Sequence, residues 1–331
     1  MRHRRRGRGR GRRGDGRERG EQGERRPGGR EPPGRERPDF ASLPATYPFR
    51  PLTLETAATT EPRTAIARRV IDLVAPLGFG QRALIVAPSK AGKTILLQAI
   101  AEGIVVNHPQ ARLYILLVDE RPEEVSEMVD WGKGEVIASS FDRPAAAHVE
   151  AAAALLARAH AEVTAGRDLV IVLDSITRLA RGHNTVERGS GRTLSGGVGA
   201  EALQAPRAFF GAARQVPAAA ESGGGSLTII ATALVETGSR MDDLIFEEFK
   251  GTGNSEIRLS RELADRRIYP AIDVSASGTR REELLIPAER LEAVQRLRRQ
   301  LVEMRSADAM NLLLDFVRRY GTNAELLSAV R

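Results

Sequence analysis

The chain has 331 residues, of which 41% are hydrophobic, so it can bury the core of one large domain or two small ones. It contains no cysteine, which excludes disulfide bonds, cysteine-based zinc sites and thiol nucleophiles and fits a cytoplasmic protein. No apolar run is long enough to span a membrane and none follows the basic N-terminus, so we expect neither membrane insertion nor export.

The net charge of +7 is concentrated at the N-terminus. Residues 1–38 hold 15 Arg and 6 acidic residues, a balance of +9, which leaves −2 for the remainder. This segment is almost entirely Arg, Gly, Glu and Pro and has nothing to bury, so we predict a disordered tail. Its Arg-Gly repeat at residues 6–12 is similar to segments that bind RNA by phosphate contact and base stacking. A solubilising tail or a partner-docking arm is the alternative, but the cationic charge favours RNA.

Predicted secondary structure begins after a Pro/Thr-rich linker at residues 39–62. Continuous apolar runs predict strands buried on both faces at residues 83–87, 113–118, 169–173 and 227–231. Helical segments between them include residues 94–104 and 145–165, which is typical of an α/β fold with a mostly parallel sheet. The C-terminal part is predicted to be helical, and residues 322–325 have the form of a capping box for the last helix.

Residues 87–94 read Ala-Pro-Ser-Lys-Ala-Gly-Lys-Thr, a Walker A motif with alanine in the first glycine position. A predicted strand enters the motif and a predicted helix leaves it, so backbone N–H groups and the helix N-terminus can surround phosphates. Lys93 is expected to reach the β- and γ-phosphates of ATP, and the Thr94 hydroxyl to hold Mg²⁺. A chance match in a structural loop is the alternative, which the order of strand, motif and helix disfavours.

Acidic residues follow two of the predicted strands, at the sheet edge where ligands gather in α/β proteins. Asp174 ends the run at residues 169–173 and is the expected Walker B ligand of Mg²⁺, although it also suits a helix N-cap. Asp119 and Glu120 follow the run at residues 113–118, and either one can orient the water that attacks ATP. The residues alone do not choose between these two.

Six longer stretches surround these positions, at residues 84–94, 118–125, 173–181, 209–214, 247–254 and 277–285. Together they resemble the transcription termination factor Rho family, and the resemblance runs from about residue 64 to near the C-terminus. The strings Asp-Glu-Arg-Pro-Glu-Glu and Glu-Glu-Phe-Lys-Gly-Thr-Gly-Asn are more specific than the Walker motifs. The resemblance implies a RecA-like P-loop ATPase domain over residues 51–331, behind a tail and linker at residues 1–50. It also implies a homohexameric ring with ATP between subunits.

The resemblance also implies residue roles. Glu120 rather than Asp119 is the implied catalytic carboxylate. Arg280 matches an arginine finger that acts on a neighbouring subunit's ATP, and Arg267 a second interface arginine, although each alone reads as a surface ion-pair partner. Tyr269 matches the aromatic residue that packs on adenine. The other implied nucleotide contacts are Gly78, Phe79, Gly80, Gln81, Arg82, Ala83, Lys90, Ala91, Gly92, Lys93, Thr94, Ile95 and Arg121.

Two glycine-containing segments resemble the RNA loops that line the central channel of this family. Residues 191–200 include Arg192, Gly196, Gly197 and Val198, and residues 237–242 include Arg240. In both, arginine stands where the family commonly has lysine. Their glycines suit close approach to another chain, but ordinary flexible surface loops are the alternative.

The sequence departs from the family at its start, because residues 1–60 cannot encode the small RNA-binding barrel that usually precedes the ATPase domain. Residues 217–225 also read as a tolerated surface insertion. We expect an ATP-dependent RNA translocase that uses Mg²⁺ and releases transcripts, with RNA, identical subunits and an RNA polymerase complex as partners. The alternatives are a non-terminating paralogue, a regulatory RNA-binding subunit that joins a full-length relative, and a RecA-type ATPase acting on DNA.

Overall fold

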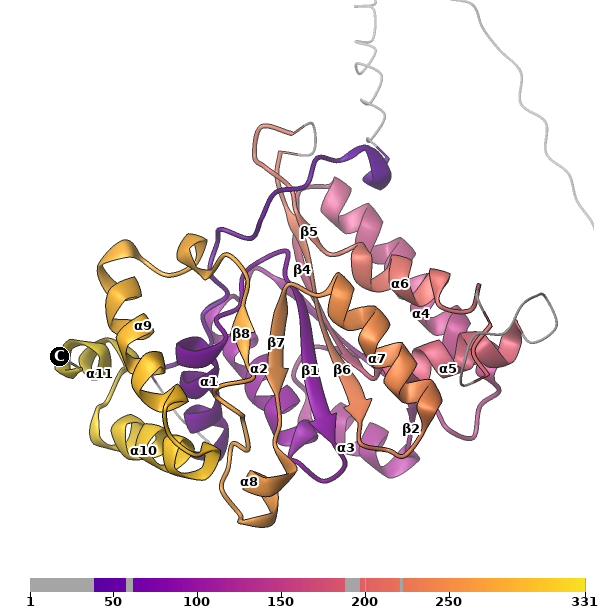
Figure 1. Ribbon diagram of the computed structural model, residues 1–331. Coiled ribbons are helices and arrows are strands. Elements are labelled where there is room, and N and C mark those ends of the chain that lie inside the picture. The colour runs from indigo at the N-terminus through magenta and orange to yellow at the C-terminus, as the bar shows by residue number, and fades with distance from the viewer. Residues whose placement is uncertain (1–38, 58–61, 188–196, 200, 221–222, 331) are drawn as a thin grey trace, which may run out of the picture. The chain divides into compact units, whose positions relative to one another are not determined.

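The computed structural model describes residues 39–57, 62–187, 197–199, 201–220 and 223–330, so the predicted tail at residues 1–38 lies outside it. The described residues form an eight-stranded sheet in the order β3-β2-β4-β6-β1-β7-β8, with β5 paired to β6 (Figure 1). All pairings are parallel except those of the two-residue strands β5 and β8. The strands are β1 Arg82–Pro88, β2 Arg112–Glu120, β3 Glu135–Ser140, β4 Asp168–Asp174, β5 Arg214–Gln215, β6 Ser226–Val235, β7 Ser255–Arg258 and β8 Gly278–Thr279.

Helices cover both faces of the sheet, which confirms the predicted α/β fold. In Figure 1, α4, α5 and α6 lie to the right of β1, β4 and β6, and α1, α9 and α10 lie to the left. Among the described helices, none is long and apolar enough to cross a membrane. The α-helices are α1 Pro62–Val74, α2 Lys93–Asn107, α3 Pro122–Trp131, α4 Ala145–Thr164, α5 Ile176–Val186, α6 Gln204–Gly211, α7 Arg240–Thr252, α8 Arg261–Asp265, α9 Ala288–Val302, α10 Ser306–Arg319 and α11 Asn323–Ala329; short 3₁₀ turns lie at Phe40–Ser42 and Glu282–Leu284.

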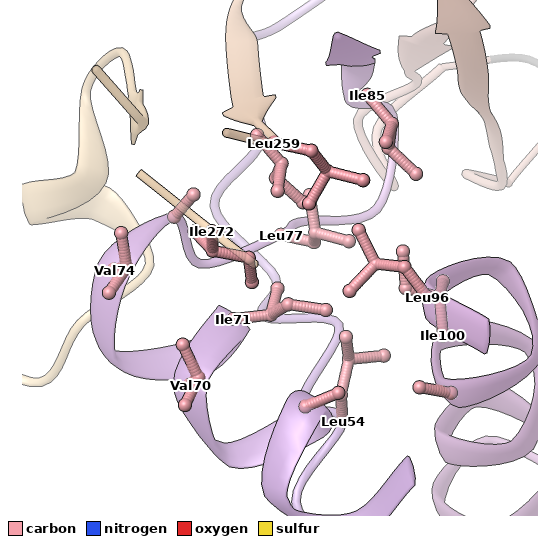
Figure 2. Close-up of a cluster of buried hydrophobic side chains, with 14 of the residues drawn as sticks. Leu54, Val70, Ile71, Val74, Leu77, Ile85, Leu96, Ile100, Leu259 and Ile272 are labelled. Carbon is pink, nitrogen blue, oxygen red and sulfur yellow. The ribbon is translucent and has the colours of Figure 1, made fainter. Parts of the chain in front are cut away.

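Side chains of each strand alternate between two cores, as the pleat of a β-strand requires. One core packs α1, α2, α9 and α10 against the sheet, and Figure 2 shows part of it, with Leu54, Ile71 and Leu96 from three different segments. The other core packs α4 to α7 against the opposite face. In β2, Leu113, Ile115 and Leu117 belong to the first core, and Tyr114, Leu116 and Val118 to the second.

The structure confirms the four predicted strands and lengthens each of them. It also contains β3 and β7, which the sequence analysis missed. β3 lies at the edge of the sheet and is only partly buried, and β7 has four residues, so neither forms a continuous apolar run. The predicted cap of α11 is confirmed, since Glu325 N–H donates to Thr322 Oγ1; the Glu325 carboxylate, however, accepts from Gly321 N–H rather than from Thr322.

The segment predicted as a linker is packed onto the domain in its described part, residues 39–57. Phe40, Leu43, Leu52 and Leu54 are all buried. Backbone bonds also fix the segment, including Leu52 N–H to Leu77 O at 2.8 Å. Isolated apolar residues between prolines show no periodic pattern, yet each fully buried leucine contributes about 2 kcal/mol of transfer free energy. The linker prediction is therefore wrong for these residues.

Candidate nucleotide and RNA sites

The loop between β1 and α2 has the backbone shape of a phosphate cradle. Lys90 and Gly92 adopt left-handed conformations, with φ of 65° and 92°. Gly92 occupies the N-cap position of α2 and gives it no side-chain cap, so the first N–H groups of the helix face the loop. Such N–H groups, together with the helix dipole, favour a bound anion. The predicted Walker A loop therefore has the geometry that its motif requires.

Lys93, at the start of α2, lies between two buried carboxylates. Its Nζ is 2.6 Å from Asp174 Oδ1 and 3.2 Å from Glu120 Oε1. Asp174 is 4% exposed and Glu120 1% exposed, and Asp174 also accepts a hydrogen bond from Thr232 Oγ1. The structure thus brings together three predicted site residues that lie 27 and 81 positions apart in the chain.

These surroundings change the pKa values of Glu120 and Lys93. Burial, together with the nearby Asp174 charge, raises the pKa of Glu120 to about 7, although Lys93 and Arg178 oppose the rise. Burial alone lowers the pKa of Lys93, but Asp174 and Glu120 outweigh it and the net pKa is raised. Lys93 therefore stays charged, whereas Glu120 gains and loses a proton near neutral pH.

A β-bulge decides which of the two adjacent acids faces Lys93. The register between β2 and β3 shifts between Val118 and Glu120, and Asp119 has a left-handed φ of 57°. The Asp119 carboxylate lies towards His148, at 4.0 Å from its Nε2. The geometry thus favours Glu120 over Asp119 as the acid of the site.

Arg178 is a site residue to which the sequence analysis gave no role. It lies on α5, about one helical turn after Asp174. Its Nη1 is 3.0 Å from Glu120 Oε2 and also donates to the carbonyl of Asp119. Its place in the site could have been predicted from its spacing from Asp174, because one helical turn returns a side chain to the same edge of the sheet.

A cavity of about 610 Å³ adjoins the phosphate loop. Its walls include Ala91, Ile95, Arg267 and Tyr269, and the Tyr269 ring lies 3.5 Å from the position that a Cβ on Gly92 would occupy. Both Ile95 and Tyr269 are exposed large apolar side chains. A cavity of this size with an aromatic wall is suited to a nucleoside. Arg267, predicted at a subunit interface, lines the cavity of its own chain.

Arg280 lies at the other end of the sheet. Its N–H donates to the carbonyl of Asn254, and the Asn254 side chain accepts from Arg82 N–H and Gln81 Nε2. Arg82 begins β1, and the phosphate loop follows the far end of that strand, about 20 Å away. Arg280 is exposed and, among the described residues, makes no ion pair. It therefore cannot reach the phosphate loop of its own chain.

The six predicted nucleotide contacts at residues 78–83 lie at this same end. A Cβ on Gly80 would come within 2.4 Å of Gln215 N, and Gln81 and Ala83 are fully buried. Phe79 is buried beneath the Arg50 guanidinium. The structure does not bring these residues to their own phosphate loop, because most of β1 lies between them and that loop. Arg121, in contrast, is exposed directly after Glu120 at the nucleotide end.

The first predicted RNA segment is described only in part, and Arg192 and Gly196 lie outside the described residues. Asn184 on α5 holds the described end, since its amide donates to Gly197 O and accepts from Gly199 N–H at 2.8 Å. The Val198 side chain is fully buried. It is a core side chain, so the predicted RNA contact at Val198, which stays a prediction, would fall on its backbone.

The second predicted RNA segment leads into α7. Arg240 is the first residue of this helix and is exposed. Two residues on, buried Asp242 accepts from Arg181 Nε at 2.8 Å and from Thr237 Oγ1 at 2.6 Å. Arg181 lies on α5, the helix that also carries Arg178 and Asn184. Through these three side chains α5 contacts Glu120 and both predicted RNA segments.

The donors near the phosphate loop are oxygen atoms, which suit Mg²⁺. They are the Asp174 carboxylate and the partly exposed Thr94 hydroxyl. No group of three or more metal-ligating Asp, Glu or His side chains occurs in the described part of the chain. A cation here therefore fits only if phosphate or water oxygens complete its shell.

Comparison with known proteins agrees with this geometry. Residues 67–279 match the ATP synthase alpha/beta family, nucleotide-binding domain. The chain is 61% identical over 295 residues to a transcription termination factor Rho of Gemmatimonas aurantiaca, a match that covers 89% of this chain and 40% of that protein. It is 53% identical over 297 residues to the Streptosporangium roseum protein of the same name, with 90% and 74% covered.

A solved structure of a prototypical ATPase from the type III secretion system of pathogenic bacteria shares the fold. The TM-score is 0.66 at 24% identity, over 79% of this chain and 82% of that one. The chain thus spans less than half of the Gemmatimonas relative, but about three quarters of the Streptosporangium one. From this extent of identity and the matched domain, the chain belongs to the transcription termination factor Rho family.

Proposed function

We propose that the protein is an RNA-dependent ATPase that moves RNA through a homohexameric ring. The observation that carries this proposal is the placement of Lys93, Glu120 and Asp174 at one end of the sheet, with Arg280 exposed at the other. A phosphate loop and an arginine at opposite ends of one chain complete each other only across an interface between chains.

Glu120 is the proposed general base. It orients the attacking water and accepts its proton, and its pKa of about 7 suits that task near neutral pH. Lys93 leaves its carboxylate partners for the β- and γ-phosphates of ATP. Thr94 and Asp174 hold Mg²⁺, which when bound neutralises charge that develops on the phosphates. Tyr269 packs on the adenine, and Ile95 lines the same cavity.

Arg280 is the proposed arginine finger for the neighbouring subunit. A guanidinium that reaches another chain's γ-phosphate stabilises charge only in the assembled ring. Arg280 lies close to Arg82. Burial, followed by the nearby charges of Arg214 and Arg280, lowers the pKa of Arg82. Three arginines thus lie close together at this end of the sheet, which suits an incoming polyphosphate.

α5 is the proposed connection between RNA and hydrolysis. Three of its side chains, one turn apart, contact Glu120, Asp242 and the Gly197 to Gly199 turn. A shift of either RNA segment would therefore move the helix that carries Arg178. In this proposal RNA binding by Arg240, and by the first RNA segment, raises the rate of ATP hydrolysis.

The proposed cellular role is the release of transcripts from an RNA polymerase complex in the cytoplasm. The 61% and 53% identity to proteins named transcription termination factor Rho supports this role.

The test is ATP turnover by the purified chain with poly(C) RNA, with single-stranded DNA and without polymer. We expect RNA to stimulate turnover at least about tenfold over the other two conditions. Equal stimulation by DNA would indicate a DNA-directed motor, and absence of turnover in all three conditions would remove the enzymatic role.

A further inference from the structure

The bulge at Asp119 exchanges the faces of two neighbouring acids. Up to Val118, odd-numbered residues of β2 face the core that contains α2, and even-numbered residues face the core that contains α4. Continued alternation would turn Asp119 towards Lys93 and Glu120 towards α4. The structure has the reverse, with Glu120 at Lys93 and Asp119 at His148 of α4. The bulge, rather than the strand, therefore selects the acid of the site.

Something must hold this bulge in place. Asp119 has no partner in β3, because Val118 pairs with Ser139 and Glu120 with Ser140. A left-handed φ at a residue other than glycine is unfavourable unless its surroundings impose it. Two side chains from the covering helices meet Asp119. Arg178 donates to its carbonyl, and His148 places Nε2 4.0 Å from its carboxylate.

His148 is itself held by Ser139. The Ser139 hydroxyl is 2.7 Å from His148 Nδ1, and both residues are only 5% exposed. When this hydroxyl donates to Nδ1, the neutral ring carries its proton on Nε2, which faces the Asp119 carboxylate. Burial lowers the pKa of His148, with Asp119 opposing, so the neutral ring is favoured. Ser139 lies opposite Val118, the last regular residue before the bulge, so it links His148 of α4 to β3 directly beside the bulge.

A Ser, His and Asp set also resembles a hydrolase triad, but the geometry excludes that role. The serine is buried and lies on Nδ1, while the carboxylate lies near Nε2. A nucleophile has to be open to its substrate and to have its own base beside it. The set is therefore built to hold a backbone position.

We propose that His148, oriented by Ser139, is a positioning residue that keeps Asp119 in the bulge and thereby turns Glu120 towards the attacking water. The proposal rests on the proposed role of Glu120 as general base. Loss of His148 lets β2 relax to regular pleating, and Asp119 then replaces Glu120 beside Lys93. An aspartate is shorter by one methylene and is misplaced for the water, so hydrolysis slows without loss of ATP binding.

The test compares His148→Ala, His148→Gln and Ser139→Ala with the wild type in RNA-stimulated turnover. A misplacement of this size lowers kcat by about 10- to 100-fold in His148→Ala, and the dissociation constant of a fluorescent ATP analogue stays within about twofold. His148→Gln retains an N–H group near Asp119 and should recover part of kcat. The matched control is His160→Ala on the same helix, whose ring stacks on Phe40 far along α4; it should lower the melting temperature but leave kcat unchanged.

A double-mutant cycle separates positioning from general damage. In a Glu120→Gln background, His148→Ala should cause no further loss of the residual turnover, because His148 acts only through Glu120. A full additional loss in that background, or a wild-type kcat for His148→Ala, would overturn the proposal. If His148→Ala does not fold, Ser139→Ala takes its place in the same cycle and tests the proposal by the same comparison. An inactive wild type, or a fully active Glu120→Gln, would instead remove the proposed function itself.

Discussion

The ammonium of Lys93 lies 2.6 Å from Asp174 Oδ1, which joins the first residue of α2 to the last residue of β4. The same ammonium lies 3.2 Å from Glu120, so one cation contacts two carboxylates that have different proposed tasks. ATP phosphates must compete with both carboxylates for this cation. Substitutions of the three residues should consequently separate nucleotide binding from hydrolysis.

Lys93→Ala should weaken ATP binding by about tenfold or more, because the phosphates lose the partly buried cation of the loop and Asp174 and Glu120 lose its charge. Glu120→Gln should bind ATP as the wild type does but hydrolyse it about 100-fold more slowly, since the amide cannot accept a proton. Equilibrium titration with a fluorescent ATP analogue and steady-state turnover measure the two properties. Near-normal turnover by Glu120→Gln would contradict its assignment as the base.

The pKa of Glu120, about 7, predicts the pH dependence of catalysis. A general base works only when it is ionised, so kcat/KM should rise with pH through about 7 and level off above that value. A profile of kcat/KM between about pH 5 and about pH 9, at saturating RNA and constant ionic strength, checks this. If kcat/KM instead rises near the ordinary pKa of glutamate, burial and Asp174 do not raise the pKa of Glu120.

The same pKa predicts an effect on stability. In the folded protein the pKa of Glu120 lies above its ordinary value of 4.5, so the folded state binds the proton more tightly than the unfolded state does. Stability from this group is present below about pH 4.5 and is lost as pH rises through about 7. From about pH 5 to about pH 8, the wild type should lose about 1 to 3 kcal/mol relative to Glu120→Gln. Urea unfolding of both proteins at the two pH values measures the difference, and an equal change in both would argue against it.

Much of this site follows from the sequence, and the rest depends on tertiary contacts. Lys93, Thr94 and Asp174 are predictable because a Walker loop and a strand tip fix them locally. The choice between Asp119 and Glu120 is not, since regular alternation would place Asp119 beside Lys93, whereas the bulge, which contacts Arg178 and His148 from other elements, places Glu120 there. The packing of residues 39–57 is missed for a similar reason, because these residues are buried against elements that lie far along the chain. Arg280 is predicted from family resemblance alone, and the sheet topology, which separates it from its own phosphate loop, supports the proposal that it serves another subunit.

The basic N-terminal arm, residues 1–38, carries a net charge of +9 in a chain of +7. Cationic segments gain affinity for nucleic acid by releasing counterions, so their contribution falls steeply with salt. Deletion of residues 1–38 should weaken RNA binding at low salt and reduce the slope of log affinity against log salt. ATP affinity should be unchanged, because the phosphate loop begins only at residue 87. Titrations that coincide for the full and shortened chains would limit RNA contact to the segments near Arg192 and Arg240.

In the proposed ring each ATP is hydrolysed between two subunits, and mixing two inactive variants is the sharpest test of this claim. Arg280→Ala keeps the phosphate loop but lacks the finger, whereas Lys93→Ala keeps the finger but has a damaged loop. Random co-assembly in a ring of head-to-tail interfaces makes about a quarter of the sites complete. We predict that each variant alone is nearly inactive with RNA and that the mixture recovers turnover in proportion to these hybrid sites. Wild-type hydrolysis by Arg280→Ala alone, or no recovery from mixed rings that demonstrably contain both variants, would contradict the claim.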